Sequence, residues 1–330
     1  MRALRLALSY DLKADYLAAG FSPAAVMEFD EEDTVAALAA TLAELGHSVE
    51  RVGRGVELAR RLAAGERWDL VFNIAEGVAG RSREAQVPAL CELYGQAYTF
   101  SDPLTAAITL DKPLAKRLVR DHGLPTPPFA VVERPEQAEA VELAPPLFVK
   151  PAAEGSSKGV TARSRGARRE ERAPACAELL AAFGQPVLVE SYLPGREMTV
   201  GIVGNGAAAA VLGVMEVVFH SGTDTDYTAL NKDEYEARVS YRLLDGEPLG
   251  LRARQVALAV YAALSCRDAA RVDLRCDASG EPCFLEVNPL PGLHPVRSDL
   301  PILCRLAGLS YRDLLSRIVA AAAERTSLWS

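Results

Sequence analysis

Apolar and polar positions along the first hundred residues follow strand-like and helix-like periods in turn. Leu4–Ser9 and Trp68–Asn73 are short apolar runs typical of buried strands, and the apolar residues of Asp33–Leu45 recur at helical spacing. Strands that alternate with helices predict a parallel sheet with helices on its faces. Ligands of such sheets lie beyond the carboxyl ends of the strands. We therefore expect residues 73–77 and 80–84 at a binding edge.

After residue 102 the order of predicted strands, helices and loops changes, and it changes again after residue 190. We therefore predict domains at 1–102, 103–190 and 191–330. Apolar runs predict strands at Pro146–Pro151, Pro186–Leu193, Met198–Val203 and Val211–Phe219. Helical spacing predicts helices at Leu110–Arg120, Gln255–Leu264, Ser298–Gly308 and Tyr311–Ala323. The charged run Arg163–Arg172 predicts a solvated segment. The polar stretch His220–Glu236 is typical of a lid, which we expect to order over a bound nucleotide.

Two alternating runs within Ala270–Pro295 flank the turn-forming residues Asp277–Gly280 and predict a β-hairpin. On its return strand, Phe284, Glu286 and Asn288 are expected to share one face. A turn of two or four residues places Asp273 opposite Glu286, Arg271 opposite Asn288 and Cys276 opposite Cys283. A turn of three residues shifts this pairing by one.

Two directly opposed carboxylates repel each other, and a divalent cation between them removes that cost. Asp273, Glu286 and the amide of Asn288 are oxygen ligands of the kind that Mg²⁺ takes, so we predict a site for one or two ions. Arg271 beside it could stabilise developing negative charge. A salt bridge on an exposed strand face is the alternative.

Composition narrows the class of protein. The chain has 330 residues, 49% of them hydrophobic, which predicts two or three folded domains. Its net charge of −8 argues against a nucleic-acid surface. No apolar run is as long as a membrane span, and the start of the chain favours a first strand over a signal peptide. Six scattered cysteines without a C-x-x-C motif predict reduced thiols and a cytoplasmic protein.

Two basic groups are candidates for anion binding. A predicted strand delivers Lys150 just before the glycine–serine loop Glu154–Gly159, whose backbone N–H groups could approach phosphates, although an ordinary turn is the alternative. Arg81 and Arg83, at the expected sheet edge, could hold a substrate carboxylate. The alternative is a solvated helix start with local ion pairs.

Five stretches in this order resemble the ATP-grasp superfamily, and most closely the D-alanine–D-alanine ligases. They are Leu110–Lys112, Thr126–Phe129, Phe148–Ser157, Val189–Val200, and Arg271–Asp273 together with Phe284–Gly292. The resemblance covers residues 103 to about 310. It implies a three-domain ATP-grasp architecture of α/β and α+β parts, with ATP between the central and C-terminal domains.

The resemblance also implies a role for individual residues. The implied nucleotide contacts are Lys112, Lys150, Glu154, Ser156, Ser157, Glu190, Tyr192, Leu193, Glu197, Lys232 and Leu285. The implied Mg²⁺ ligands are Asp273, Glu286 and Asn288, and the implied catalytic groups are Arg271, Lys232, Ser156 and the backbone N–H of Gly292. Candidate substrate contacts are Asn73, Glu76, Arg81, Arg83, Arg271, His294 and Ser298.

The implied activity is an ATP-dependent ligase that joins small amino acids through an acyl phosphate. Alternatives are the same chemistry on another amino acid in specialised metabolism, or a nucleotide-binding homologue without catalysis. The expected partners are small amino-acid-like molecules. Neither a nucleic acid nor a membrane is expected as a partner, and a homodimer is a possible assembly.

At the substrate end the chain departs from the ligases that it resembles. Ser9–Asp15 stands where they carry a glycine-rich loop with a gripping glutamate, and the residues around Glu76 and Glu84 also differ. Because Arg81 and Arg83 bring two cations to this edge, we expect at least one substrate with an extra or differently placed carboxylate. D-alanine alone is then expected to be a poor substrate.

Overall fold

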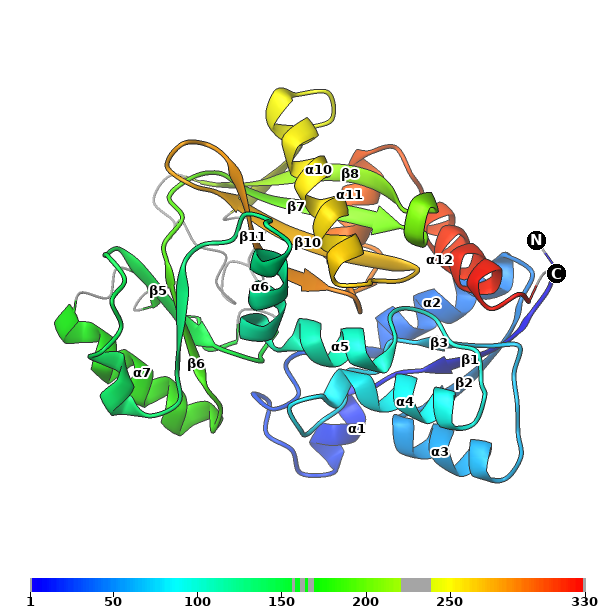
Figure 1. Ribbon diagram of the computed structural model, residues 1–330. Helices are drawn as coiled ribbons and strands as arrows, with labels where there is room; N and C mark the ends of the chain where they lie inside the picture. Colours follow the sequence, from blue (N-terminus) through cyan, green and yellow to red (C-terminus); the bar gives the residue numbers. More distant parts are fainter. Residues whose placement is uncertain (1, 156–157, 161–163, 166–168, 221–238, 329–330) are drawn as a thin grey trace.

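The computed structural model describes residues 2–155, 158–160, 164–165, 169–220 and 239–328. The strands in this part of the chain form three sheets that follow one another along the sequence (Figure 1). The first is parallel and the other two are antiparallel. The predicted combination of an α/β part with α+β parts is therefore confirmed.

The first sheet has the strand order β2-β1-β3. Its elements are β1 (Arg5–Ser9), α1 (Lys13–Ala18), α2 (Glu32–Glu44), β2 (Ser48–Gly53), α3 (Gly55–Ala63), β3 (Leu70–Asn73), a 3-10 helix η1 (Arg83–Ala85) and α4 (Gln86–Leu93). All four residues of β3 are buried, as its apolar run predicted. Helices α3 and α4 contribute to the core on one face and α2 to the core on the other. The loop after β3 leaves the carboxyl end of the sheet, where a binding edge was expected.

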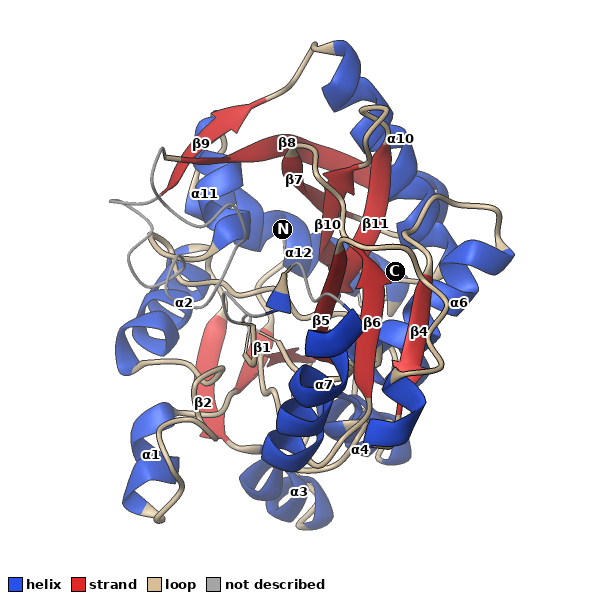
Figure 2. Ribbon diagram, turned by 90° about the vertical axis from the view of Figure 1, so that its left-hand side faces the viewer, coloured by secondary structure: helices blue, strands red, loops and turns tan. Residues whose placement is uncertain are grey.

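The central sheet has the order β4-β6-β5, with α7 packed on it (Figure 2). Its elements are β4 (Phe129–Val132), a 3-10 helix η2 (Pro135–Ala138), β5 (Leu147–Pro151), α7 (Arg169–Phe183) and β6 (Val187–Ser191). The prediction of a solvated segment at Arg163–Arg172 is wrong for the last residues of that range. Residues from Arg169 onward belong to α7, and Arg172 is buried beside the backbone carbonyl of Glu139.

The large sheet has the order β11-β10-β7-β8-β9. Its elements are β7 (Glu197–Val203), a 3-10 helix η4 (Gly206–Ala208), β8 (Ala210–Phe219), β9 (Val239–Leu243), α10 (Pro248–Ala263), β10 (Ala269–Cys276), β11 (Pro282–Asn288), α11 (Asp299–Leu306) and α12 (Tyr311–Arg325). Helix α10 covers one face and α11 the other. No helix in the described ranges has the length and apolar character needed to cross a membrane.

Two connecting helices tie the three sheets together. Helices α5 (Pro103–Leu110) and α6 (Lys112–Asp121) each begin at an aspartate, Asp102 or Asp111, whose side chain accepts a backbone N–H of the first turn. The predicted single helix Leu110–Arg120 therefore starts two residues later. Helix α6 packs its apolar side against β11 and α10, and its Lys116 reaches Glu190 of the central sheet.

The first and third parts share one hydrophobic core. Leu6 and Phe72 of the parallel sheet lie in the same buried cluster as Leu300 of α11 and Ile318 of α12. Helix α12 also packs beside α2 (Figure 1). At its end, Arg325 forms an ion pair with the fully buried Asp268 at 2.8 Å. The loops of the N-terminal part are thereby held against the large sheet, where the candidate site lies.

Candidate functional site

Two adjoining cavities lie where the three parts meet. The sheet cavity lies between the central and large sheets and is lined by residues including Phe148, Lys150, Glu190, Tyr192, Leu193, Glu197, Asp273, Arg275 and Leu285. The edge cavity lies beside the loops of the parallel sheet and is lined by residues including Glu28, Asp30, Glu76, Glu84, Asn288, Gly292, His294 and Ser298. Both are lined by Lys112, Glu154, Arg271, Glu286 and Asp299. A ligand in one cavity therefore borders a ligand in the other.

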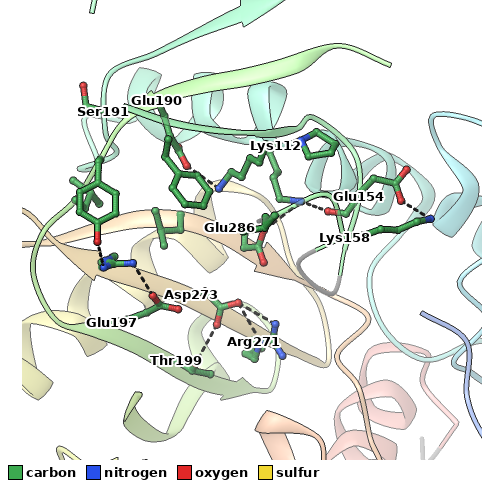
Figure 3. A pocket seen from close by; sticks show the side chains of 18 of the residues that line it. Lys112, Glu154, Lys158, Glu190, Ser191, Glu197, Thr199, Arg271, Asp273 and Glu286 are labelled. Atoms are coloured by element: carbon green, nitrogen blue, oxygen red, sulfur yellow. Dashed lines mark hydrogen bonds and ion pairs between the residues drawn. The ribbon is translucent and has the colours of Figure 1, made fainter. Parts of the chain in front are cut away.

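The hairpin β10–β11 forms the floor of this junction. Asp273 pairs with Glu286 and Arg271 with Asn288, as predicted. Arg271 is buried, and its guanidinium lies 3.0 Å from Asp273 (Figure 3) and 2.7 Å from Asp299. Burial raises the pKa of Asp273; Arg271 opposes that shift, and Glu286 adds to it. The opposed carboxylates thus have an electrostatic cost that a cation between them would remove.

The tip of the hairpin is paired differently from the prediction. An irregularity between Asp273 and Leu274 brings Leu274 opposite Phe284, so Leu285 is an extra residue on β11. Phe284 is fully buried on the apolar face and does not share a face with Glu286. Leu285 instead turns to the sheet cavity.

This bulge also separates the two cysteines expected to face each other. Cys276 pairs with Pro282, and Cys283 pairs with Arg275. The prediction that they are opposed is therefore wrong. All six cysteines are free and buried.

A network of buried lysine and glutamate side chains lies at one wall of the sheet cavity. Lys150 lies 2.7 Å from one carboxylate oxygen of Glu190, and Lys116 lies 2.8 Å from the other. Burial alone would raise the pKa of Glu190, but Lys116 and Lys150 outweigh it and lower the pKa. Lys112 reaches from the start of α6 to the carbonyl of Glu154 and to Glu286 at 3.2 Å (Figure 3). Lys112 and Lys150 therefore bring positive charge to one wall of the cavity.

The other end of the sheet cavity is aromatic. Phe148 and Tyr192 are stacked, with ring centroids 6.5 Å apart. Arg275 lies over the Tyr192 ring, donates a hydrogen bond to the Tyr192 hydroxyl at 2.6 Å, and pairs with Glu197 at 3.1 Å. Leu193 and Leu285 add apolar walls. A flat apolar ring suits this end, and a polyphosphate suits the lysine end.

The loop after β11 forms one side of the edge cavity. A side chain at Gly292 would come within 2.9 Å of Ser298 Oγ, so the loop passes too closely for a Cβ. Ser298 Oγ accepts the backbone N–H of His294 at 3.0 Å. His294 Nδ1 accepts two backbone N–H groups, and its Nε2 lies 3.1 Å from Asp33. His294 therefore shapes the cavity wall, and both of its ring nitrogens are already engaged.

Another part of the edge-cavity lining is acidic. Burial raises the pKa of Asp30 to about 7, and the nearby charges of Asp11 and Asp33 add to the effect. Burial, with the charge of Glu84 adding to it, raises the pKa of Glu76 well above its ordinary value. Burial also raises the pKa of Glu84 to about 7. These carboxylates are poorly stabilised as anions by the protein around them.

Three predicted substrate contacts do not line either cavity. Arg81 is 70% exposed and pairs with the helix-capping Asp111 at 2.6 Å. Arg83 is buried, pairs with Glu28 at 2.9 Å and donates to a backbone carbonyl. Asn73 is buried, and its side-chain oxygen accepts a backbone N–H two residues on.

The expectation of an extra substrate carboxylate rested on Arg81 and Arg83, and the positions of these two residues do not support it. Arg81 and Arg83 already have protein anions as partners, whereas Glu76 and Glu84 line the edge cavity. Three further predicted residues, Ser156, Ser157 and Lys232, lie outside the described residues, as does most of the predicted lid His220–Glu236.

Sequence reasoning missed several side chains that the fold brings to the site. They are Glu28, Asp30, Lys116, Phe148, Thr199, Arg275 and Asp299. Arg275 could have been found, because it shares the alternating face of Arg271 and Asp273. Asp30 and Glu28 lie in a loop without a period, so no local pattern marked them.

The donor set fits both a nucleotide and Mg²⁺. Asp273 and Glu286 face each other across two strands, and Asn288 adds an amide, which donates to Asp273 at 3.1 Å. The Asn288 amide would have to turn its oxygen toward a cation. Asp, Glu and Asn oxygens are the ligands that Mg²⁺ prefers together with phosphates. The lysine end of the sheet cavity directly adjoins this group.

Comparisons with known proteins agree with this geometry. Residues 118–320 match the sequence model of the D-ala D-ala ligase C-terminus. The chain is 36% identical over 273 residues to the D-alanine–D-alanine ligase of Cupriavidus pinatubonensis, covering 80% of this chain and 78% of that one. It is 35% identical over 260 residues to "Uncharacterized protein y4sG" of Sinorhizobium fredii, covering 78% and 75%.

A solved structure resembles the whole chain. The D-alanine–D-alanine ligase of Bacillus anthracis, determined in complex with ATP, matches with a TM-score of 0.73 and 21% identity. The match covers 99% of this chain and 100% of that one, which shows a common fold. Taken with the match over residues 118–320 and the relatives of about 36% identity, the chain belongs to the D-alanine–D-alanine ligase family of ATP-dependent ligases.

Proposed function

We propose that this protein joins two amino acids by an amide bond, with ATP in the sheet cavity and the amino acids in the edge cavity. The observation that carries the proposal is the group Arg271, Asp273 and Glu286 at the junction of the two cavities. A carboxylate in the edge cavity would there border the phosphate end of a nucleotide in the sheet cavity.

The sheet cavity supplies binding groups for a nucleotide along its length. Tyr192, Leu193 and Leu285 would hold the base, and Glu197 is the candidate contact of the ribose. Lys112 and Lys150 would neutralise phosphate charge, and Glu190 holds Lys150 in place. Positioning and charge neutralisation are the main contributions that a protein makes to phosphoryl transfer.

Mg²⁺ would be held by Asp273, Glu286 and Asn288 and would offset charge on the phosphates. A substrate carboxylate would take the γ-phosphoryl group of ATP, giving an acyl phosphate and ADP. The amine of the second substrate would then attack the acyl carbon, forming the amide and releasing phosphate and a proton. Arg271 is held by Asp273 and Asp299 at the place where charge develops on the transferring group. The backbone N–H of Gly292 and the hydroxyl of Ser298 are candidates for gripping a substrate oxygen.

An amino-acid panel scored for ADP release tests the proposal, with mass spectrometry of the products. We expect ADP only when an amino acid, ATP and Mg²⁺ are all present, and a product with the mass of an amide. ADP without any new amide would contradict a ligase. Complete absence of ADP from folded protein would favour the non-catalytic homologue.

We further propose that the protein works in the cytoplasm, where its six buried thiols stay reduced.

A further inference from the structure

The edge cavity has a charge imbalance that a neutral amino acid does not match. It measures about 470 Å³, within the roughly 300–1,000 Å³ of small-molecule sites. Among the described residues, eight aspartates and glutamates line it against four lysines and arginines. A cavity of one dominant sign attracts ligands of the other sign.

The four basic side chains are already paired with carboxylates of the protein. Lys13 lies 2.7 Å from Glu31, and Lys112 lies 3.2 Å from Glu286. Arg271 lies 2.7 Å from Asp299. The last one, Arg297, lies 2.8 Å from Asp33, an exposed aspartate of α2.

Two other lining carboxylates are paired with cations that lie outside the cavity wall. Glu28 pairs with Arg83 at 2.9 Å and accepts the backbone N–H of Gly155. Glu154 pairs with Lys158 at 3.0 Å. The protein therefore compensates five of the eight lining carboxylates.

Asp30, Glu76 and Glu84 are the three that are left over. Within the described residues, none of them forms an ion pair with a lysine or arginine. They come from three separate segments, the loop before α2, the loop after β3 and η1, and they converge on one cavity. Uncompensated carboxylates in a partly buried site are costly unless a ligand pairs with them.

The α-ammonium of an ordinary amino acid can pair with only one or two of these groups. A second cation on the same substrate would pair with the remainder. The raised pKa values of Asp30 and Glu84 agree with this, because burial outweighs the stabilising charge of Lys13 at Asp30 and of Arg83 and Lys112 at Glu84. Arg271 lines both cavities, and Gly292 and Ser298 line the edge cavity with it, so the substrate carboxylate would lie at the phosphate side.

We propose that the edge cavity takes an amino acid whose side chain carries a second cation, an ammonium or a guanidinium, held by Asp30, Glu76 and Glu84. This rests on the proposed function, because it names the substrate class of that same site. It replaces the expectation of an extra carboxylate, which the pairing of Arg81 and Arg83 removed.

Ornithine and norvaline are the matched probes, because they differ only in the terminal ammonium. Each is supplied in D and L forms, with lysine, arginine and alanine alongside, at fixed ATP and Mg²⁺. We expect kcat/KM for one form of ornithine, lysine or arginine to exceed that of the matched neutral amino acid at least tenfold. The comparison of ornithine with arginine distinguishes an ammonium from a guanidinium.

Glu76→Gln and Glu84→Gln, singly and together, test the residues. They keep the shape of the side chain and remove its charge. We expect the double variant to lose at least tenfold of the preference for the cationic substrate, through KM and not kcat. Glu324→Gln on α12, which is exposed and lines neither cavity, is the control and should keep the wild-type preference.

Binding calorimetry with ADP and Mg²⁺ separates this proposal from the ligase itself. If cationic amino acids bind but no ADP is ever released from ATP, the substrate class stands and the ligase is wrong. If ADP is released equally well or better with norvaline or alanine, the ligase stands and the cationic substrate is wrong. The wild-type panel gives this answer even if the variants fail to fold.

Discussion

Lys116 Nζ lies 2.8 Å from Oε2 of Glu190, and both side chains are shielded from solvent, with exposed fractions of 0% and 3%. Lys116 also donates to the carbonyl of Phe284 on β11 at 3.2 Å and to Thr126 at 3.1 Å. It thus joins α6, the central sheet and the hairpin β10–β11. Burial lowers the pKa of Lys116 to about 8, against the opposing effect of Glu190.

Lys116→Met should lower the free energy of unfolding by about 3 kcal/mol, because it removes one partner of a buried ion pair. It should also raise KM for ATP, since Glu190 then draws Lys150 away from the phosphates. Lys13→Met, which breaks a partly exposed pair with Glu31, should cost less than about 1 kcal/mol. Equal losses for the two variants in urea denaturation would contradict the role of Lys116.

Glu286→Gln should nearly abolish ADP release and leave the protein folded. The change removes one of two opposed carboxylates, so Mg²⁺ binds more weakly and phosphate charge stays uncompensated. ADP release measured over a range of Mg²⁺ concentrations checks this. Glu281→Gln at the exposed tip of the same hairpin is the control and should behave as wild type. Normal turnover by folded Glu286→Gln would remove the metal assignment.

Asp30 should make stability depend on pH. Its folded pKa of about 7 lies above its ordinary value of 3.8, so the folded protein binds more protons between these two values. The stability from this group is complete below about pH 4 and is lost as pH rises through 7. Asp30→Asn should therefore be more stable than wild type at pH 8, by about 1–3 kcal/mol, with little difference near pH 4. Thermal unfolding at both pH values measures it, and a variant less stable at pH 8 would speak against the raised pKa.

Arg81 and Arg83 should differ when each is replaced by alanine. Arg81→Ala should change substrate KM by less than about threefold, because Arg81 is largely exposed and lines neither cavity. Arg83→Ala leaves the buried Glu28 without its cation and should cost about 3 kcal/mol of stability. Steady-state kinetics and chemical denaturation of both variants check this. A tenfold rise in KM for Arg81→Ala would bring back a direct substrate contact.

The six cysteines should react slowly in the folded protein. Burial raises the pKa of Cys91 to about 12 and that of Cys283 to about 11, and the thiolate is the reactive form. After unfolding without a reductant, intact-mass labelling should find six free thiols. Fewer than six would show an unexpected disulfide.

Periodicity predicted the parts of the fold that have a regular apolar pattern. The predicted ends of β3 and α2 lie within two residues of the observed ends. A continuous apolar run marks the strand, and apolar residues at helical spacing mark the helix. Strand β2, with a single buried residue among six, was missed. The start of α7 was predicted to be a solvated segment because its residues are mostly charged. The apolar residues that pack this helix on the central sheet come later in the helix.

The candidate site was predictable where a sequence pattern carries the geometry. Alternation along the hairpin was enough to oppose Asp273 and Glu286, but no local signal marked the extra residue at Leu285. Arg83 was assigned to the substrate because its partner Glu28 lies 55 residues earlier in the chain. Tertiary pairing of this kind decides whether a charged side chain faces a cavity or the protein.

The core shared by the parallel sheet and the last two helices has a consequence for the order of folding. Leu6 and Phe72 are made early in translation, whereas Leu300 and Ile318, which bury them, are made near its end. The first part therefore has to wait for the last before its apolar face is covered. A fragment of residues 1–102 should accordingly exchange its β1 and β3 amide hydrogens rapidly, in contrast to the full chain. Protection of these amides in the fragment equal to that in the whole protein would show that the nascent first part folds alone.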